Sequence, residues 1–191
     1  MNKIRNEKLL NLCNLSFGHY LKPTQDKGIS YLQVKNFSDD GEYLDNVENF
    51  VQEKNIKESL LLEQDDILFV SKGMRFFAYK YETSIGTAIA SSIFYIIKVD
   101  ADLILADYLV CILNHPKSMA YFNGVSAGSS IPSIRKKELL DFEIPVLSIL
   151  EQEEIVKIYK LHAEQQKIVT ELKQKNQSRF NQVINQLIEN K

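Results

Sequence analysis

The chain has 191 residues, of which 45% are hydrophobic, 25% charged and 10% aromatic. This composition is typical of a globular protein and excludes a disordered, collagen-like or low-complexity chain. The net charge is −2, so overall charge alone does not indicate nucleic-acid binding. No apolar run approaches the ~18 residues of a membrane span, and no secretion signal is recognisable. Two isolated cysteines, Cys13 and Cys111, fit a reducing compartment, so we expect a cytoplasmic protein with no membrane partner.

Residues 1–147 hold every glycine and proline of the chain together with many β-forming residues, which predicts an α+β domain. In chain order, the pattern predicts a strand at 31–34, a turn at 39–41, a hairpin of 67–70 with 76–81, and a strand at 89–99. A helix follows at 105–116, ended by Pro116, then a small-residue loop at 121–134 and a short apolar run at 139–144.

Residues 148–191 contain neither glycine nor proline, and we assign them to a second domain, one long helix. Ser148 is the expected N-cap, and Glu151 completes a capping box. Such a helix would be ~65 Å long at 1.5 Å per residue. The polar residues His162 and Gln165 and the polar run 173–179 interrupt its apolar stripe, so strict heptads are absent. The predicted helix-pairing residues are Ile155, Ile158, Leu161, Ile168, Val169, Leu172, Val183 and Leu187.

Charge is unevenly distributed along the first domain. Residues 39–66 carry ten acidic side chains against two lysines, whereas residues 112–137 carry four basic side chains and no acid. Residues 8–38 and 67–99 each have a net charge of +3. The three basic segments also contain Gly/Ser-rich loops and aromatic residues, a combination that suits contacts to phosphates.

Motifs for catalysis or nucleotide binding are missing from the sequence. There is no P-loop, no G-x-G-x-x-G, and no Asn/Asp-Pro-Pro-aromatic tetrapeptide of an amino-methyltransferase. Glu171 and Lys173 are expected to be solvated helix charges, and the three histidines are isolated. The serines at 126, 129 and 130 lack a recognisable base. We therefore expect no catalytic residue, no metal site and no enzymatic activity in this chain.

Several motifs stand in an order that resembles a target-recognition domain of type I restriction-modification specificity subunits. They are YLQVKNFSDDGEY, DDILFVSKG, ASSIFYIIKVD, ADYLVCILNHP and GVSAGSSIPSIRKKELLDFEIPVLSILEQEEIV. The most specific part is the succession Ile131-Pro132, Ile144-Pro145 and Glu151-Gln152. The resemblance covers about residues 9–190. The chain departs from the pattern at Asp65, where the family has glycine, and at Ser148, where it has a second proline.

The resemblance implies an α+β recognition domain with a mixed, curved β-sheet and short helices, followed by a coiled-coil-type helix. It implies sequence-specific binding of double-stranded DNA beside methyltransferase (modification) subunits and, for cleavage, restriction/translocase subunits. S-adenosylmethionine, Mg and ATP would belong to those partners, and this chain would hold no cofactor. Full family members carry two recognition domains and two antiparallel helices. This chain has one of each, which favours a homodimer of half-subunits that reads an interrupted palindrome.

The basic segments and their loops supply the candidate DNA-binding residues. For phosphates these are Lys22, Lys35, Lys72, Arg75, Lys80 and Lys136, and for base edges they are Asn36, Arg75, Ser126 and Ser129. Two other interpretations stay open: a truncated or silent cassette that only assembles with partners, and the detached recognition end of a methyltransferase-nuclease. A duplex-binding assay distinguishes a cassette that only assembles with partners from a subunit that recognises DNA. An Asn-Pro-Pro-aromatic motif upstream in the same reading frame would favour the second.

Overall fold

The structure is a computed structural model that describes residues 5–53, 56–128 and 130–189. Contacts divide the chain into two compact units, one ending at Gln152 and one beginning at Glu153. The first unit combines strands and short helices, and the second is helical throughout its described length. The α+β fold class expected from the sequence is therefore confirmed.

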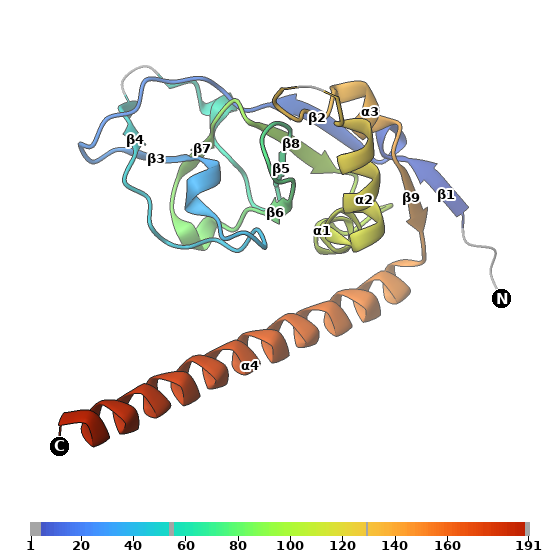
Figure 1. Cartoon of the computed structure of the whole chain (residues 1–191). Helices are drawn as coiled ribbons and strands as arrows, with labels where there is room; N and C mark the ends of the chain where they lie inside the picture. The colour runs from blue at the N-terminus through green and yellow to red at the C-terminus, as the bar shows by residue number, and fades with distance from the viewer. Residues whose placement is uncertain (1–4, 54–55, 129, 190–191) are drawn as a thin grey trace. The chain divides into compact units, whose positions relative to one another are not determined.

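The described strands form three sheets (Figure 1). The largest is antiparallel, in the order β2-β8-β5-β6, and consists of Cys13–Phe17, Phe94–Val99, Ile67–Val70 and Ala78–Lys80. The second is mixed, with β3 (Ile29–Leu32) antiparallel to β4 (Phe50–Val51) and parallel to β7 (Ala88–Ala90). The third pairs β1 (Arg5–Lys8) antiparallel with β9 (Glu143–Val146).

Three short helices complete the first unit: α1 (Ala106–Asn114), α2 (Pro116–Val125) and α3 (Lys136–Leu140). All four residues of β5 are buried, since this strand lies between β8 and β6 and packs against helices. Phe122 of α2, for example, stacks edge-on against Phe69 of β5 with ring centroids 5.0 Å apart. At the sheet's β6 edge, the Asn114 amide pairs with both backbone groups of Ala78 at 2.8 Å, which blocks this edge against further strand pairing.

Several predicted elements are confirmed with shifted boundaries. The hairpin is β5 with β6, and the 105–116 helix is α1. The expected strand at 31–34 is β3, which lies two residues earlier because Val34 already belongs to a 3-10 turn. The turn at 39–41 is also present: Gly41 has a φ of +83°, and a Cβ there would approach the Phe77 ring to 2.9 Å.

Two expectations about the fold were wrong, the single strand at 89–99 and the start of the loop at 121. The 89–99 segment forms two strands, β7 and β8, because the chain turns at 91–93. Pro116 does end α1, but it also starts α2 as its first residue, where its missing N–H is no loss. The expected loop at 121–134 therefore begins only after Val125. Strands β1 and β2 were not expected, since their sequences show little β-forming character.

The long helix α4 (Ile149–Glu189, 41 residues) begins with the predicted capping box. The Ser148 hydroxyl donates to Glu151 Oε2 at 2.6 Å, and the Ser148 backbone N–H donates to the same oxygen at 3.0 Å. These hydrogen bonds lower the pKa of Glu151 below its ordinary value. No described helix, α4 included, is long and apolar enough to cross a membrane.

Gln152 fixes the first turn of α4 within the first unit. Its side chain is 0% exposed, accepts from the Leu105 N–H at 2.8 Å, and donates to the carbonyls of Leu103 (3.0 Å) and Leu147 (2.9 Å). The Glu-Gln pair quoted above as a motif therefore has a structural explanation. Glutamate caps the helix, and glutamine joins its start to the segment before α1.

Candidate nucleic-acid interface

Four segments far apart in the sequence meet at one edge of the four-stranded sheet, which we call the basic edge: residues 15–22, 71–75, 91–93 and 130–137. The loops 71–75 and 130–134 are joined by backbone hydrogen bonds from Gly73 to Pro132 and from Ile134 to Ser71, both 2.9 Å long. The Ser71 N–H and hydroxyl reach the Ile93 carbonyl at 2.8 and 2.6 Å. His19 forms a bridge to Ser91 and completes the connection.

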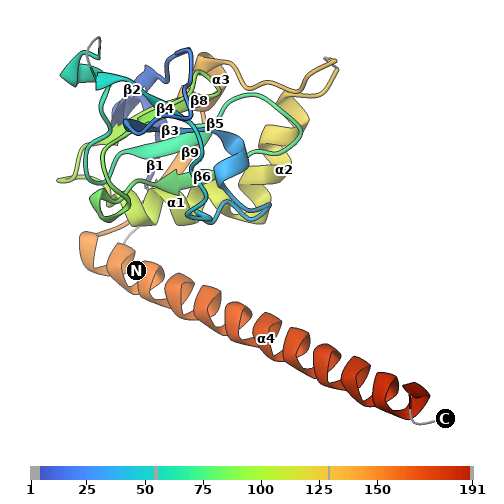
Figure 2. The same ribbon diagram turned by 90° about the vertical axis from the view of Figure 1, so that its left-hand side faces the viewer.

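The position of α3 at this edge is fixed by contacts to β2 and β8. The Tyr95 hydroxyl donates to the Ile134 carbonyl at 2.9 Å, just before the helix. The Lys136 ammonium donates to the Leu15 carbonyl at 3.3 Å and lies 5.6 Å from the centre of the Phe17 ring. Figure 2 shows the gold-coloured loop that precedes α3 extending outward from the rest of the first unit.

Acidic residues are absent from the sequence that builds this edge. Residues 13–25, 67–81 and 108–137 contain no aspartate or glutamate. The basic side chains contributed to the edge are Lys22, Lys72, Arg75, Arg135, Lys136 and Lys137. Of these, Lys137 forms an ion pair with Asp141, and Arg135 lies 3.9 Å from Glu138. Lys22 and Lys72 are exposed and stand in acid-free sequence.

Exposed apolar side chains at the basic edge were missed by the sequence reasoning. Met74 is 89% exposed and Tyr20 84%, although the residues that precede them, Gly73 and His19, form backbone hydrogen bonds to other segments. Phe17 and Ile131 are also largely exposed. The signal available in the sequence was an apolar residue directly after Lys72-Gly73, within a stretch free of acids.

Among the predicted phosphate-binding residues, Lys72 and Lys136 lie together on this edge, and Lys22 is exposed on the segment that follows His19. Lys22 also lines a surface hollow with Pro23, Thr24 and Gln52. Lys35 is exposed but lies 4.0 Å from the carboxylate of Glu48, which belongs to the acidic segment 39–66.

Arg75 does not have the free guanidinium that a phosphate or base contact requires. Its Nη2 donates to the carbonyls of Val34 (3.1 Å) and Phe37 (2.9 Å), and its Nη1 pairs with Asp39. The guanidinium also lies 5.7 Å from the centre of the Phe77 ring. This residue therefore anchors the 71–75 loop to the 34–39 segment, a structural role that the sequence did not lead us to expect.

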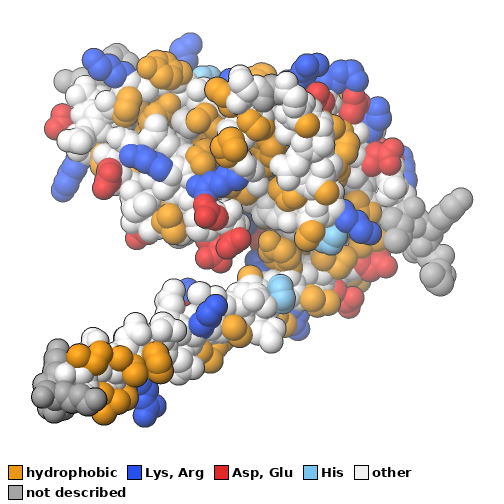
Figure 3. Space-filling model, in the orientation of Figure 1, with side chains coloured by type: hydrophobic (Ala, Val, Ile, Leu, Met, Phe, Trp, Pro, Cys, Tyr) orange, Lys and Arg blue, Asp and Glu red, His pale blue; other side chains and the backbone are white. Residues whose placement is uncertain are grey.

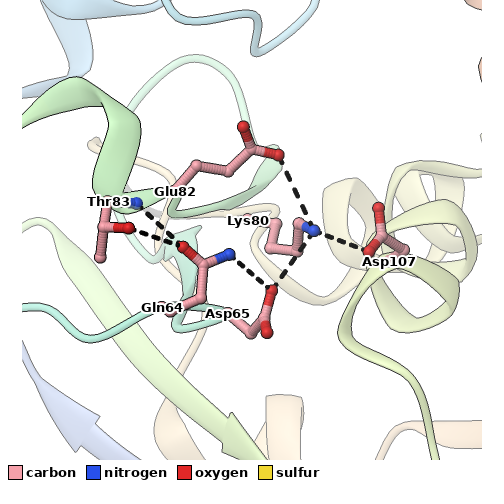
Figure 4. Close-up of polar contacts among 6 residues, drawn as sticks. All are labelled: Gln64, Asp65, Lys80, Glu82, Thr83 and Asp107. Atoms are coloured by element: carbon pink, nitrogen blue, oxygen red, sulfur yellow. Dashed lines mark hydrogen bonds and ion pairs between the residues drawn. The ribbon is translucent and has the colours of Figure 1, made fainter.

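Lys80 is likewise engaged within the protein (Figure 4). Its ammonium lies 2.7 Å from Asp107, 3.3 Å from Asp65 and 3.8 Å from Glu82, and its side chain is 15% exposed. Burial lowers the pKa of Lys80, but the hydrogen bonds and charges of Asp107 and Asp65 outweigh burial and raise the pKa above its ordinary value. Three carboxylates around one cation leave this cluster negative, which is unsuitable for a phosphate contact.

Two predicted base-reading residues are buried. Asn36 is 1% exposed and its side-chain oxygen accepts from the Gln33 N–H at 2.9 Å, while its amide donates to Asn46. The Ser126 hydroxyl donates to the Asn123 carbonyl at 3.2 Å, at the end of α2. Both residues shape turns, so neither presents a free group to a base. Ser129 lies outside the described residues.

The predicted pairing residues of α4 form an apolar stripe that is open to solvent within the second unit. Ile158, Leu161, Ile168, Val169, Leu172, Val183 and Leu187 are each roughly half or more exposed, and only Ile155 is partly covered. Phe180 and Ile188 extend the stripe. Figure 3 shows hydrophobic side chains (orange) on the surface of the helix. Within the described part of the chain, no group of three His, Cys, Asp or Glu residues is placed to hold a metal ion.

Comparison with known proteins gives structural matches only. No family model and no curated protein sequence matches the chain. Among solved structures, the S subunit of the type I restriction-modification system from M. genitalium aligns with a TM-score of 0.61 at 15% identity, over 86% of this chain and 40% of that chain. The HsdS subunit from Thermoanaerobacter tengcongensis aligns with a TM-score of 0.60 at 15% identity, over 84% and 37%.

A third match comes from a structure that describes complex assembly and conformational transition of the type I R-M system. Its TM-score is 0.63 at 15% identity, over 86% of this chain and 39% of that one. The chain therefore spans about two fifths of the length of these solved proteins. It shares its fold with the S subunits of type I restriction-modification systems.

Proposed function

We propose that this chain is a DNA-recognition subunit of a type I restriction-modification system. The observation that carries the proposal is the fold match to S subunits over 84–86% of the chain. In this proposal residues 1–147 form the recognition domain and residues 148–191 form the assembly helix. The chain directs partner subunits to a DNA site in the cytoplasm and catalyses no reaction itself.

The chemistry of the basic edge supports DNA as the ligand. A duplex presents a dense row of phosphates, and lysines on an acid-free surface neutralise them with release of counterions. Lys22, Lys72 and Lys136 are assigned to phosphates, where they set the position of the protein on the duplex. Lys35 is left out because of its acidic surroundings, and Arg75, Lys80, Asn36 and Ser126 have internal roles.

The partners follow from the same proposal. Methyltransferase subunits would supply S-adenosylmethionine chemistry, and restriction/translocase subunits would supply ATP- and Mg-dependent cleavage. The sequence of this chain has no P-loop and no methyltransferase tetrapeptide, in keeping with a division between recognition here and catalysis in the partners.

The second part of the proposal is a homodimer of two such chains, held together by antiparallel α4 helices. Part of the stripe is symmetric about a point near the middle of α4, between Thr170 and Glu171. In an antiparallel pair centred there, Gln165 faces Asn176 and His162 faces Arg179, while Ile158 faces Val183, Leu161 faces Phe180 and Val169 faces Leu172. Ile155, Ile168 and Leu187 face the polar residues Gln186, Lys173 and Glu154. The polar interruptions 162 and 165 thus meet polar residues, which is how polar core positions specify register in paired helices.

Binding to duplex DNA as a function of salt tests the proposed function. We expect the full chain to bind duplex with an affinity that falls steeply as salt rises. The double variant K72A/K136A should flatten the slope of log affinity against log salt by about 2, since each lysine neutralises about one phosphate. Lys57, an exposed lysine of the acidic segment, provides the matched control K57A, with an unchanged slope. A slope that stays the same in the double variant would remove the basic edge from the interface.

Binding to methyltransferase subunits without any binding to DNA would instead favour the assembly-module interpretation. The same experiment with the partner subunits present therefore decides between the two.

A further inference from the structure

The loops 71–75 and 130–134 together form a tip on the basic edge. The proposed function uses only the positive charge of this tip, but the tip also carries an exposed apolar side chain. Met74 is 89% exposed, directly after Lys72 and Gly73. A single exposed apolar residue is ordinary on a protein surface. Ile131, on the loop hydrogen-bonded to this one, is 58% exposed, so two apolar side chains stand on the same small tip.

The tip is an ordered two-stranded unit. Lys72 and Ser133 form an antiparallel bridge, and hydrogen bonds of 2.9 Å flank it on both sides. Behind the tip, Ser71 is fixed to Ile93, and Arg75 is fixed to the carbonyls of Val34 and Phe37. Gly73 has a φ of +131°, a conformation that side chains other than glycine rarely adopt. The Gly73 backbone on one side of Met74 and the Arg75 guanidinium on the other are therefore held, and the methionine side chain is exposed.

The charge of the residues around this tip indicates which kind of surface the tip can bind. Neither loop nor the sequence around it carries an acid: residues 67–81 and 108–137 contain lysine and arginine but no aspartate or glutamate. An apolar protein partner would leave Lys72 without a counter-charge. A duplex groove satisfies both features, because phosphates line its rim while base edges and thymine methyl groups form its floor.

We infer that this two-stranded tip enters the major groove of the DNA and that Met74 makes an apolar contact with a base, with Lys72 on the adjacent phosphate. The major groove is wide enough for a two-stranded β unit. The inference rests on the proposed function and adds a specificity residue to it. Met74 distinguishes one base pair from the others, whereas the lysines contribute equally on any sequence.

The test compares M74A with the wild-type chain on two duplexes, the site selected by the wild type from a random pool and a random-sequence duplex. M74A should bind the selected site ~10–100-fold more weakly, the loss expected when the burial of one large apolar side chain is removed. Its affinity for random duplex and its salt slope should stay unchanged, because no phosphate contact is lost. M74L, similar in volume, should retain most of the affinity.

Leu44, an exposed apolar residue in the acidic segment, gives the control L44A, which should bind both duplexes like the wild type. Repeating the selection with M74A should abolish the preference at one base pair of each half-site and leave the others intact.

Failure of the inference and failure of the proposed function give different results in these experiments. A wild-type chain that prefers one site, with M74A equal to it on that site, overturns the inference and leaves the proposed function standing. Equal weakening of M74A on both duplexes also overturns it, since that result assigns Met74 to general affinity. A wild-type chain with no preference among duplexes overturns the proposed function and the inference together.

Discussion

At the scale of single residues, the same type of side chain has opposite roles in different surroundings. Arg75 and Lys72 are three positions apart in one loop, yet the Arg75 guanidinium is bonded to two carbonyls and Asp39, whereas Lys72 is exposed. The difference arises because Arg75 lies against the 34–39 segment, where the carbonyls of Val34 and Phe37 accept from its guanidinium. A buried carbonyl without a partner is costly, so this arginine stabilises the fold.

Replacing Arg75 with alanine should therefore lower the free energy of unfolding by about 2 kcal/mol, because the charged hydrogen bonds to the carbonyls of Val34 and Phe37 are lost together. Chemical denaturation of R75A and wild type measures the difference. Arg135, which is much more exposed, gives the control R135A, expected within about 0.5 kcal/mol of wild type. An R75A chain as stable as the wild type would mean that the arginine is not an anchor.

Asp141 gives a pH-dependent prediction. Hydrogen bonds from Lys137 and Lys8, together with their charges, lower the pKa of Asp141 from 3.8 to about 2. A carboxylate whose pKa is lowered by folding contributes stability above its unfolded pKa, and that stability is lost as the pH falls through the folded value. D141N should thus be less stable than wild type at neutral pH, and the gap should close between pH 4 and 2. Urea unfolding across this range measures it. A gap that is constant with pH would contradict the assignment.

The sequence was sufficient to expect exposed lysines on the basic edge, but it could not identify the side chains that are engaged within the protein. Lys72 and Lys136 are exposed, and their contact with DNA stays a prediction. The sequence predicted DNA contacts for Arg75 and Lys80 because it does not reveal their internal partners, which are distant in the chain. Val34 is 41 positions from Arg75, and Asp107 is 27 positions from Lys80. Local charge counts contain no information about such pairings, which depend on how the strands are arranged.

At the scale of elements, the sequence predicted the helices and strands that have strong local signals and missed those whose signals are weak. The capping box, the absence of glycine and proline, and the long polar-apolar pattern predicted α4, whose first helical residue is Ile149. Strand β2 could not be predicted, since its five residues Cys13–Phe17 alternate weakly and are mostly exposed. It forms by pairing with β8 along its whole length, a contact over some 80 positions of sequence.

The exposed stripe of α4 gives a prediction about assembly. Val169 lies at the centre of the proposed pair, where each copy would contact the other's Leu172. V169D should therefore dissociate the dimer, since it places a charge in the apolar seam of both helices. Analytical ultracentrifugation should find the wild type dimeric and V169D monomeric at micromolar concentration. The matched control K167A changes a charged residue of the same helix turn and should stay dimeric. A monomeric wild type would contradict the proposed pair.

At the scale of the whole molecule, the described chain consists of one α+β unit and one helical unit, and a dimer would have two of each. Two identical units related by a two-fold axis contact identical, inverted half-sites. The proposed antiparallel helices would then act as a spacer between these half-sites. Helix length, rather than the reading loops, would determine the number of base pairs between them.

A deletion in the helix tests this spacing. Removal of residues 167–173 takes out two helical turns, about 10 Å, and keeps the stripe nearly in phase. The remaining residues keep the proposed partners, because the deletion is nearly symmetric about the centre of the pair. The preferred spacer should shorten by about three base pairs, at ~3.4 Å per base pair, with the half-site bases unchanged. A spacer that does not change would show that α4 does not set it.

The most direct test of the proposed function is selection of duplexes from a random pool by the full chain together with its methyltransferase subunits. DNA recognition by a pair of identical subunits predicts enrichment of one interrupted palindrome, in which two inverted half-sites flank a spacer of fixed length and any sequence. Selection that enriches no sequence would contradict a recognition role. An asymmetric site would contradict the homodimer.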